Sequence, residues 1–354
     1  MRTTLLLILS ALAIAAPGGP DVQQLMDNGH WKRARDLAEA DYKAHPNDAH
    51  AAFVLARVRH EFGRVEEAAK LAETAVHLDP KVSQYHRELG EACADAAGKL
   101  SFFKQISYGR RIHGEFDAAL AIAPKDPDNL MDQVQYFMEA PGVIGGDKKK
   151  AAEIANEMVK IDAARGYLAL AYIAQKQKEE SKLERLYQKA VDANPGNIEA
   201  HLSLFGLYVR AQTLNLSAAE KHAKAALDLK PDRIDGHRLL AYVLVLEKRY
   251  DDAAKVVAHA EAAIPDDLSP YVTAARAMLR DGVELPKAES YLQKYISQTK
   301  EPEANSSSLE GAHWSLGLVY EKEGRKPDAI KELETALRIK PNFEPAKRDL
   351  KRLK

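Results

Sequence analysis

Prolines recur along this chain just after segments with a helical pattern, and two pairs of them share one spacing. Pro46 and Pro80 lie 34 residues apart, as do Pro231 and Pro265. Because proline cannot continue a helix, each one marks the end of a helical unit. A period of this length predicts a repeat architecture, in which each unit packs mainly against its neighbours. The series continues, with longer spacings that require insertions, at Pro124, Pro195 and Pro341.

The last unit shows the pattern within one repeat most clearly. We expect a first helix around Ala312–Tyr320, a turn at Gly324, and a second helix that ends before Pro341. Small residues stand where the two helices would cross, and bulky apolar residues stand beside them. The residues in this pattern resemble the consensus of the tetratricopeptide repeat, and they are Leu316, Gly317, Tyr320, Ala329, Leu333 and Ala336.

Other units repeat this spacing, so the resemblance covers residues 21–343. It implies an all-α, right-handed solenoid of about eight TPR-like helix pairs, with a capping helix from Glu344. The remaining units are marked by Ala34 before Pro46, by Leu55, Gly63, Ala68 and Ala75, by Ala169, Tyr187 and Ala190, by Leu204, Ala219 and Ala226, by Leu240, Ala253 and Ala260, and by Ala288 and Leu292. We divide the solenoid into N-terminal units (17–97), irregular units (98–163), middle units (164–303) and a C-terminal unit with its cap (304–354).

The irregular units contain a long helix and a glycine-rich loop. The pattern predicts helices over Leu100–Ala123 and Pro127–Glu139, followed by a loop that contains Gly145-Gly146. Together with Phe103-Lys104-Gln105, this stretch resembles a subset of exported bacterial tetratricopeptide proteins. The loop could be an anion site that uses Lys148 to Lys150, or a structural connection in which Asp147 caps the next helix. An enzymatic site in residues 98–150 would require Arg110, Arg111 and Lys148 to converge on a carboxylate or histidine.

The N-terminus has the pattern of a signal peptide. Arg2 precedes an apolar run from Leu5 to Ile14, and the small residues Ala15 and Ala16 follow. The run is too short to span a bilayer comfortably, so we expect cleavage after residue 15 or 16, and a periplasmic or secreted mature chain without a membrane span. A retained anchor is the alternative.

Composition excludes several classes of function. The formal net charge is -1, so the chain as a whole has no positive electrostatic field that would attract nucleic acid. The single cysteine, Cys93, cannot form an internal disulfide and is expected to be a buried thiol. The 12 histidines form no metal-binding motif, and no nucleotide-binding or hydrolase motif occurs. We therefore expect no catalytic residue, metal or cofactor.

The expected function is the binding of a protein or peptide partner. In a solenoid of helix pairs the first helices line the concave face, and a partner would bind in that groove. A structural subunit of a cell-envelope complex, which would use the outer face, is the alternative. The candidate groove residues, placed by alignment with the repeat consensus, are Phe53, Arg57, His60, Leu168, Tyr172, Arg238, Tyr242, Trp314 and Leu318.

Overall fold

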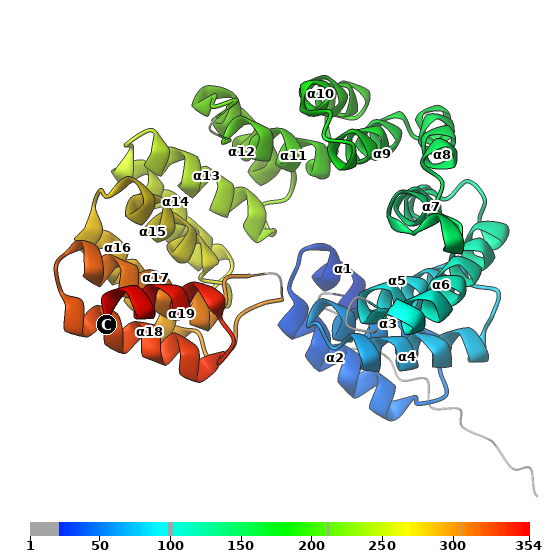
Figure 1. The fold of residues 1–354 in the computed structure, drawn as a ribbon, viewed down its shortest axis with the longest axis horizontal. Helices are drawn as coiled ribbons and strands as arrows, with labels where there is room; N and C mark the ends of the chain where they lie inside the picture. The colour runs from blue at the N-terminus through cyan, green and yellow to red at the C-terminus, as the bar shows by residue number, and fades with distance from the viewer. Residues whose placement is uncertain (1–20, 98–101, 211, 305) are drawn as a thin grey trace, which may run out of the picture.

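The computed structural model describes residues 21–97, 102–210, 212–304 and 306–354, and it is all-helical there (Figure 1). The expected signal peptide and Leu100, the expected start of the long helix, lie outside the described residues. No helix in the described part of the chain is long and apolar enough to span a bilayer.

Nineteen α-helices in the described residues follow one another in pairs, as the repeat pattern predicts. The first helices of the pairs are α1 (Val22–Asp27), α3 (Ala49–Glu61), α5 (Ser83–Ala97), α7 (Pro127–Glu139), α9 (Ala163–Lys176), α11 (Ile198–Tyr208), α13 (Ile234–Leu246), α15 (Ser269–Asp281) and α17 (Leu309–Lys322). The second helices are α2 (Trp31–Ala44), α4 (Val65–Leu78), α6 (Phe102–Ile122), α8 (Lys148–Ile161), α10 (Leu183–Ala193), α12 (Leu216–Leu229), α14 (Tyr250–Ala263), α16 (Leu285–Gln298) and α18 (Lys326–Ile339). The last helix, α19 (Glu344–Leu353), follows as the cap. Eight pairs are of full length and the first is short, which confirms the predicted architecture.

Small residues of the repeat pattern lie at the helix crossings, as expected. Ala329, Leu333 and Ala336 on α18 are fully buried. A side chain added at Gly317 on α17 would lie 3.2 Å from the carbonyl oxygen of Ala329, so the two helices are in close contact there. Alanine at position 329 is therefore required by the space between α17 and α18.

Replacement of Ala329 by leucine is expected to destabilise the chain by about 1–3 kcal/mol, because overpacking forces the neighbouring helices apart. Lys331, two residues along the same helix, is exposed, so Lys331→Leu is the matched control and should change stability little. Thermal unfolding monitored by circular dichroism would measure both. Equal losses of stability in the two variants would show that the repeat register is wrong.

The irregular units have the predicted helices and a compact loop. α6 is 21 residues long, and α7 has the bounds expected from the sequence. A short 3-10 helix (Gly142–Ile144) follows, and Gly145 has φ of +101°, a left-handed conformation that favours glycine. The side chain of Asp147 then accepts hydrogen bonds from the backbone N–H groups of Lys149 and Lys150. Asp147 thus satisfies the donors that an anion would have used, which supports the structural interpretation of this loop.

The two ends of the solenoid meet, so that the helices form a ring (Figure 1). Helix α2 contacts the loop between α14 and α15 and the loop between α16 and α17. The Arg35 guanidinium donates to Glu301 at 2.7 and 3.0 Å, and Arg33 Nε donates to Asp266 Oδ2 at 2.8 Å while its Nη2 pairs with Oδ1. These contacts join residues more than 230 positions apart in the sequence, and we call them the closure contact.

Lys32 forms the buried part of the closure contact. Its ammonium group donates to the backbone carbonyls of Asp266 (2.8 Å) and Glu301 (3.1 Å), and its backbone N–H donates to Glu303 Oε2 at 3.0 Å. Glu303 is buried, with 5% of its surface exposed. Burial raises the pKa of Glu303 to about 7, and the charges of Asp266 and Asp267 add to this, although Lys32 opposes it. The closure contact therefore includes a carboxyl group that is costly to ionise.

Candidate functional site

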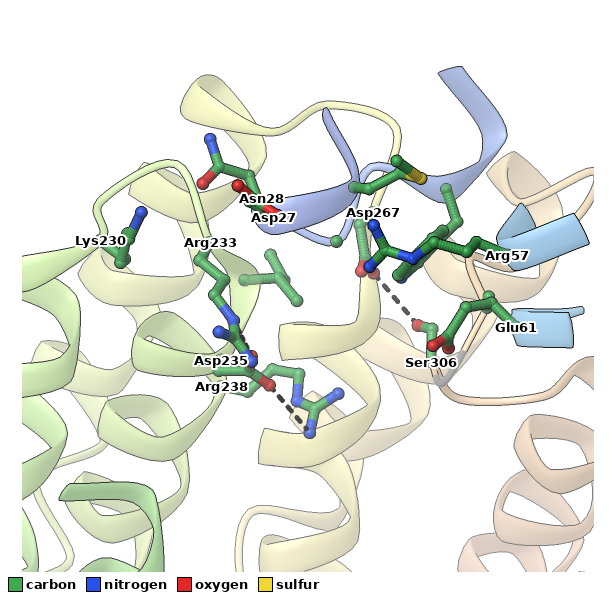
Figure 2. A pocket seen from close by; sticks show the side chains of 15 residues that line it. Asp27, Asn28, Arg57, Glu61, Lys230, Arg233, Asp235, Arg238, Asp267 and Ser306 are labelled. Atoms are coloured by element: carbon green, nitrogen blue, oxygen red, sulfur yellow. Dashed lines mark hydrogen bonds and ion pairs between the residues drawn. The ribbon is translucent and has the colours of Figure 1, made fainter. Parts of the chain in front are cut away.

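A pocket of about 500 Å³ lies on the inner side of the closure contact (Figure 2). Both ends of the solenoid and the middle units contribute to its wall. Its polar lining residues are Asp27 and Asn28 at the end of α1, Arg57 and Glu61 on α3, Lys230 and Arg233 between α12 and α13, Asp235 and Arg238 on α13, and Asp267 and Ser306 in the two closure loops.

Helices α3 and α13 are positioned by local sequence features. The side chain of Asp48 accepts a hydrogen bond from the backbone N–H of Ala51 and so fixes the start of α3. At Gly236 on α13, an added side chain would lie 2.5 Å from Leu227 Cα, so only glycine lets α12 and α13 approach this closely. These two features position the helices that carry Arg57 and Arg238, which both line the pocket.

The carboxylates that line the pocket already have partners. Asp235 accepts from Arg233 at 2.8 Å, and Asp27 accepts from Gln23 at 2.7 Å. Asp267 accepts from the backbone N–H of Ser269 at 2.8 Å and from the Ser306 hydroxyl at 3.2 Å. Glu61 also has an interaction partner. Anionic groups of the pocket are therefore engaged within the protein.

Two arginines of the pocket are held more weakly than its carboxylates. Arg57 Nη1 donates to Gln23 Oε1 at 3.3 Å, and its guanidinium lies 5.8 Å from the centre of the Phe53 ring. Arg238 Nη2 lies 3.7 Å from Asp235 Oδ1, beyond hydrogen-bonding distance. A guanidinium has five N–H donors, and these contacts use only some of them. The pocket therefore offers unused guanidinium N–H donors to an anionic group.

Among the predicted groove residues, only Arg57 and Arg238 come together in this pocket. Phe53 was expected beside them, but it is 5% exposed and packs against Tyr85, with ring centres 5.0 Å apart. Helix α3 lies against α2, α4 and α5, so its apolar residues point into a core and not into the groove. A partner could not reach Phe53 without rearrangement of that core.

The other predicted residues lie on the first helices but in separate places. Trp314 and Leu318 on α17 line a second pocket with Arg276 and Arg280, and Leu168 on α9 lines a third with Arg165. Trp314, Tyr172 and Tyr242 are partly engaged in packing between repeats. The Trp314 indole N–H donates to Asp349 at 2.9 Å, Tyr172 donates to Glu139, and Tyr242 accepts from Arg280.

His60 lies in a row of charged side chains on α3, α5 and α7. Its Nδ1 is 3.0 Å from Glu88 Oε1, and its Nε2 is 3.1 Å from Asp95 Oδ2. Burial opposes the charged imidazolium, but the hydrogen bonds to these carboxylates outweigh it and raise the pKa of His60 to about 9. Asp132 on α7 lies beside Glu91, and burial together with the charge of Glu91 raises the pKa of Asp132 to about 8.

Comparison with known protein families identifies the repeat. Residues 22–83, 61–101 and 311–343 match the family described as tetratricopeptide repeat. Residues 22–101 and 311–343 therefore contain tetratricopeptide repeats. The matched segments cover the N-terminal units and the C-terminal unit, and the C-terminal unit is the one with the clearest sequence pattern.

Several solved structures are similar to this chain. Yeast Tom70 is 13% identical, with 94% of this chain and 86% of that chain covered and a TM-score of 0.48. A tetratricopeptide repeat protein from Parabacteroides merdae is 14% identical, with 86% and 98% covered and a TM-score of 0.45. YrrB, described as a TPR protein with an unusual peptide-binding site, is 19% identical, with 56% and 99% covered and a TM-score of 0.36. No curated protein matches the chain.

An enzymatic site in the irregular repeats would need Arg110, Arg111 and Lys148 to converge. Arg111 pairs with Glu73 on α4 at 2.6 Å, whereas Arg110 and Lys148 are exposed. The pocket between α5, α6 and α7 is lined by His60, Glu91 and Tyr136 and by none of these three cations.

Proposed function

We propose that this chain is a non-catalytic scaffold that binds an acidic segment of a protein or peptide partner on the inner face of its tetratricopeptide repeats. The observation that carries the proposal is the pocket in which Arg57 and Arg238 face a space whose carboxylates are already paired. A carboxylate of the partner, from a side chain or a chain end, would bind both guanidinium groups. YrrB is described as a TPR protein with a peptide-binding site, and this description supports only the class of partner that we propose here.

Alanine at Arg57 or Arg238 is expected to weaken partner binding by about 2 kcal/mol or more, because a buried arginine anchor would be lost. The partner would first be captured with the full chain from its host, and its binding segment would then be titrated by calorimetry. A double variant, Lys148→Gln with Lys149→Gln, is the control and should bind normally. Loss of binding in this double variant, with normal binding in both arginine variants, would place the functional site at the glycine-rich loop.

Trp314 and Leu318 offer a second contact for the same partner. They line a pocket of about 600 Å³ on α15 and α17 with mostly apolar walls and two arginines, Arg276 and Arg280. An apolar side chain of the bound segment would fit there while its acidic group occupies the pocket of Arg57 and Arg238.

We also propose that the chain is exported and belongs with the exported bacterial proteins that its irregular units (98–163) resemble. The support is the charged residue Arg2 before the apolar run Leu5–Ile14 and the small residues after it. Mass spectrometry of the native protein should find a mature chain that begins after residue 15 or 16. A native chain that retains Met1 would contradict export with cleavage.

A further inference from the structure

The pocket of Trp314 and Leu318 contains a cation that an apolar side chain would leave unpaired. Arg276 on α15 is partly buried there, and its Nε donates to Ser315 Oγ at 3.0 Å. A guanidinium has five N–H donors, and this hydrogen bond uses one of them. Among the described residues, no carboxylate pairs with Arg276 and no acceptor binds its Nη1 or Nη2 group. Four N–H donors at the wall of the pocket are therefore available to a ligand.

Two neighbouring charged groups of the same pocket already have partners. Arg280, one turn further along α15, donates to the Tyr242 hydroxyl at 2.6 Å, and Glu321 accepts from Arg352 at 2.8 Å. Burial lowers the pKa of Arg276, because the guanidinium has lost water without gaining a counter-ion. A charge that is shielded from water and unpaired is costly. Arg276 is thus the group of this pocket that a bound anion would stabilise.

Helix α17 holds the guanidinium of Arg276 in place before a ligand binds. Ser315 is fully buried, and its hydroxyl donates to the Gly311 carbonyl at 2.8 Å while it accepts from Arg276. A side chain added at Gly311 would lie 2.7 Å from Nη2 of Arg276, so glycine at this position leaves room for the guanidinium. The cation is therefore positioned in advance, which reduces the entropy that a ligand must lose to be bound.

The remaining walls of the pocket are mostly apolar, and its aromatic ring is held by the fold. Leu279, Trp314 and Leu318 line it, and its volume of about 600 Å³ is typical of sites for small molecules. The indole N–H of Trp314 donates to Asp349 at 2.9 Å, and the ring packs edge-on against Phe343, with ring centres 6.1 Å apart. One unpaired cation beside apolar walls favours a ligand with one negative charge and a hydrocarbon body.

We propose that this pocket binds a small, apolar monocarboxylic acid as a free ligand. Nη1 and Nη2 of Arg276 donate to the two oxygens of its carboxylate, and its hydrocarbon part lies against Trp314 and Leu318. The site is formed by two adjacent first helices, α15 and α17, so it does not depend on the arginine pocket, which is the pocket of Arg57 and Arg238. It does not depend on the proposed protein partner either, whose apolar side chain would compete with the acid for the same walls.

The two tryptophans of the chain report on the two pockets separately, because Trp31 lines the arginine pocket and Trp314 lines this one. The test is titration of the full chain, labelled with ¹⁵N-tryptophan, with phenylacetate, followed by NMR of the two indole N–H groups. Trp31→Phe assigns the signals. The Trp314 signal should shift until it saturates, while the Trp31 signal stays in place. Phenylacetamide, which has the same shape without the charge, should bind at least about 10-fold more weakly.

A pair of arginine variants adds a second measurement. Arg276→Gln should weaken the binding of phenylacetate at least about 10-fold, because the cation is lost. Arg338→Gln is the matched control: it makes the same change of charge on α18, where Arg338 is exposed and contacts Thr335, and it should leave the affinity unchanged. An unshifted Trp31 signal shows that the Arg276 variant is folded, and if it is not, the comparison of acid and amide on the unaltered chain decides the matter.

Four results would overturn the proposal. The first two are a Trp314 signal that does not shift to saturation and equal affinities for phenylacetate and phenylacetamide, since either would mean that Arg276 receives no anion. A shift of the Trp31 signal in place of the Trp314 signal would put the acid in the arginine pocket. Binding of a short peptide that ends in phenylalanine at least about 10-fold more tightly than phenylacetate would assign the pocket to a chain end and not to a free acid.

Discussion

Replacement of both Asp266 and Glu301 by arginine is expected to open the ring. Each carboxylate pairs with an arginine of α2 through both of its oxygens. An exposed salt bridge contributes only about 0–1 kcal/mol, but charge reversal replaces two attractions with two repulsions, a combined change of about 2–4 kcal/mol. Small-angle X-ray scattering at low salt should therefore show a larger radius of gyration and a larger maximum dimension.

Two further variants separate ring opening from general effects of charge. Glu289 and Glu321 pair with Arg325 and Arg352, between neighbouring helices rather than across the closure contact. Their double replacement by arginine makes the same change of net charge and should leave the dimensions unchanged. Addition of Arg33→Asp and Arg35→Glu to the first variant should restore the compact form. An unchanged scattering profile in the first variant would mean that the hydrogen bonds of Lys32 suffice to hold the ring closed.

Glu303 is expected to make closure weaker as the pH rises from about 5 to about 7.5. Because its pKa is raised to about 7 in the closed ring, closure favours the protonated carboxyl group. The stabilisation of the closed ring by the protonated carboxyl group is complete below the ordinary pKa of glutamate. It is lost as the pH rises toward 7, and it does not return at higher pH. A shift from 4.5 to about 7 corresponds to about 3 kcal/mol.

Glu303→Gln should remove this pH dependence, and the comparison of the two chains isolates it. Lys32, Asp266 and Asp267 face the same carboxyl group, and the nearby His30 has a pKa lowered by burial, so its protonation opposes folding at low pH. Those contributions are present in both chains. Denaturant unfolding at pH 5 to 8 gives the difference between the free energies of unfolding of the two chains. Because the carboxyl group of Glu303 is buried, this difference should change by a few kcal/mol over that range. A constant difference would show that Glu303 ionises freely.

The repeat fold could be predicted because its determinants are local. Ala329, Leu333 and Ala336 recur at helical spacing, and a proline closes most units, so the sequence itself indicates both the helices and their crossings. Similarly, Pro127 and the glutamate at 139 bound α7 as expected, and Asp147 caps α8. Each of these features depends only on neighbours within one or two repeats.

The candidate site could be predicted only in part, because it depends on contacts between distant repeats. Alignment with the consensus placed Arg57 and Arg238 on the inner face, but their meeting in one pocket depends on the sum of all angles between repeats. Phe53 lies in a core, and the periodicity of α3 does not distinguish a groove from a core that surrounds most of the helix. The row of charged side chains that contains His60, Glu88 and Asp132 comes from three helices, so no local sequence motif predicts it.

The closed ring changes how a substitution in one repeat affects the rest of the chain. In an open solenoid each repeat senses only its neighbours, and a small change of angle between two units simply displaces the free end. Here the angles of all units must add up to one turn, because α2 has to reach the loops at Asp266 and Glu301. A change of angle in any repeat therefore produces strain at the closure contact. The arginine pocket lies beside that contact, so the same strain would change the geometry of a carboxylate bound there.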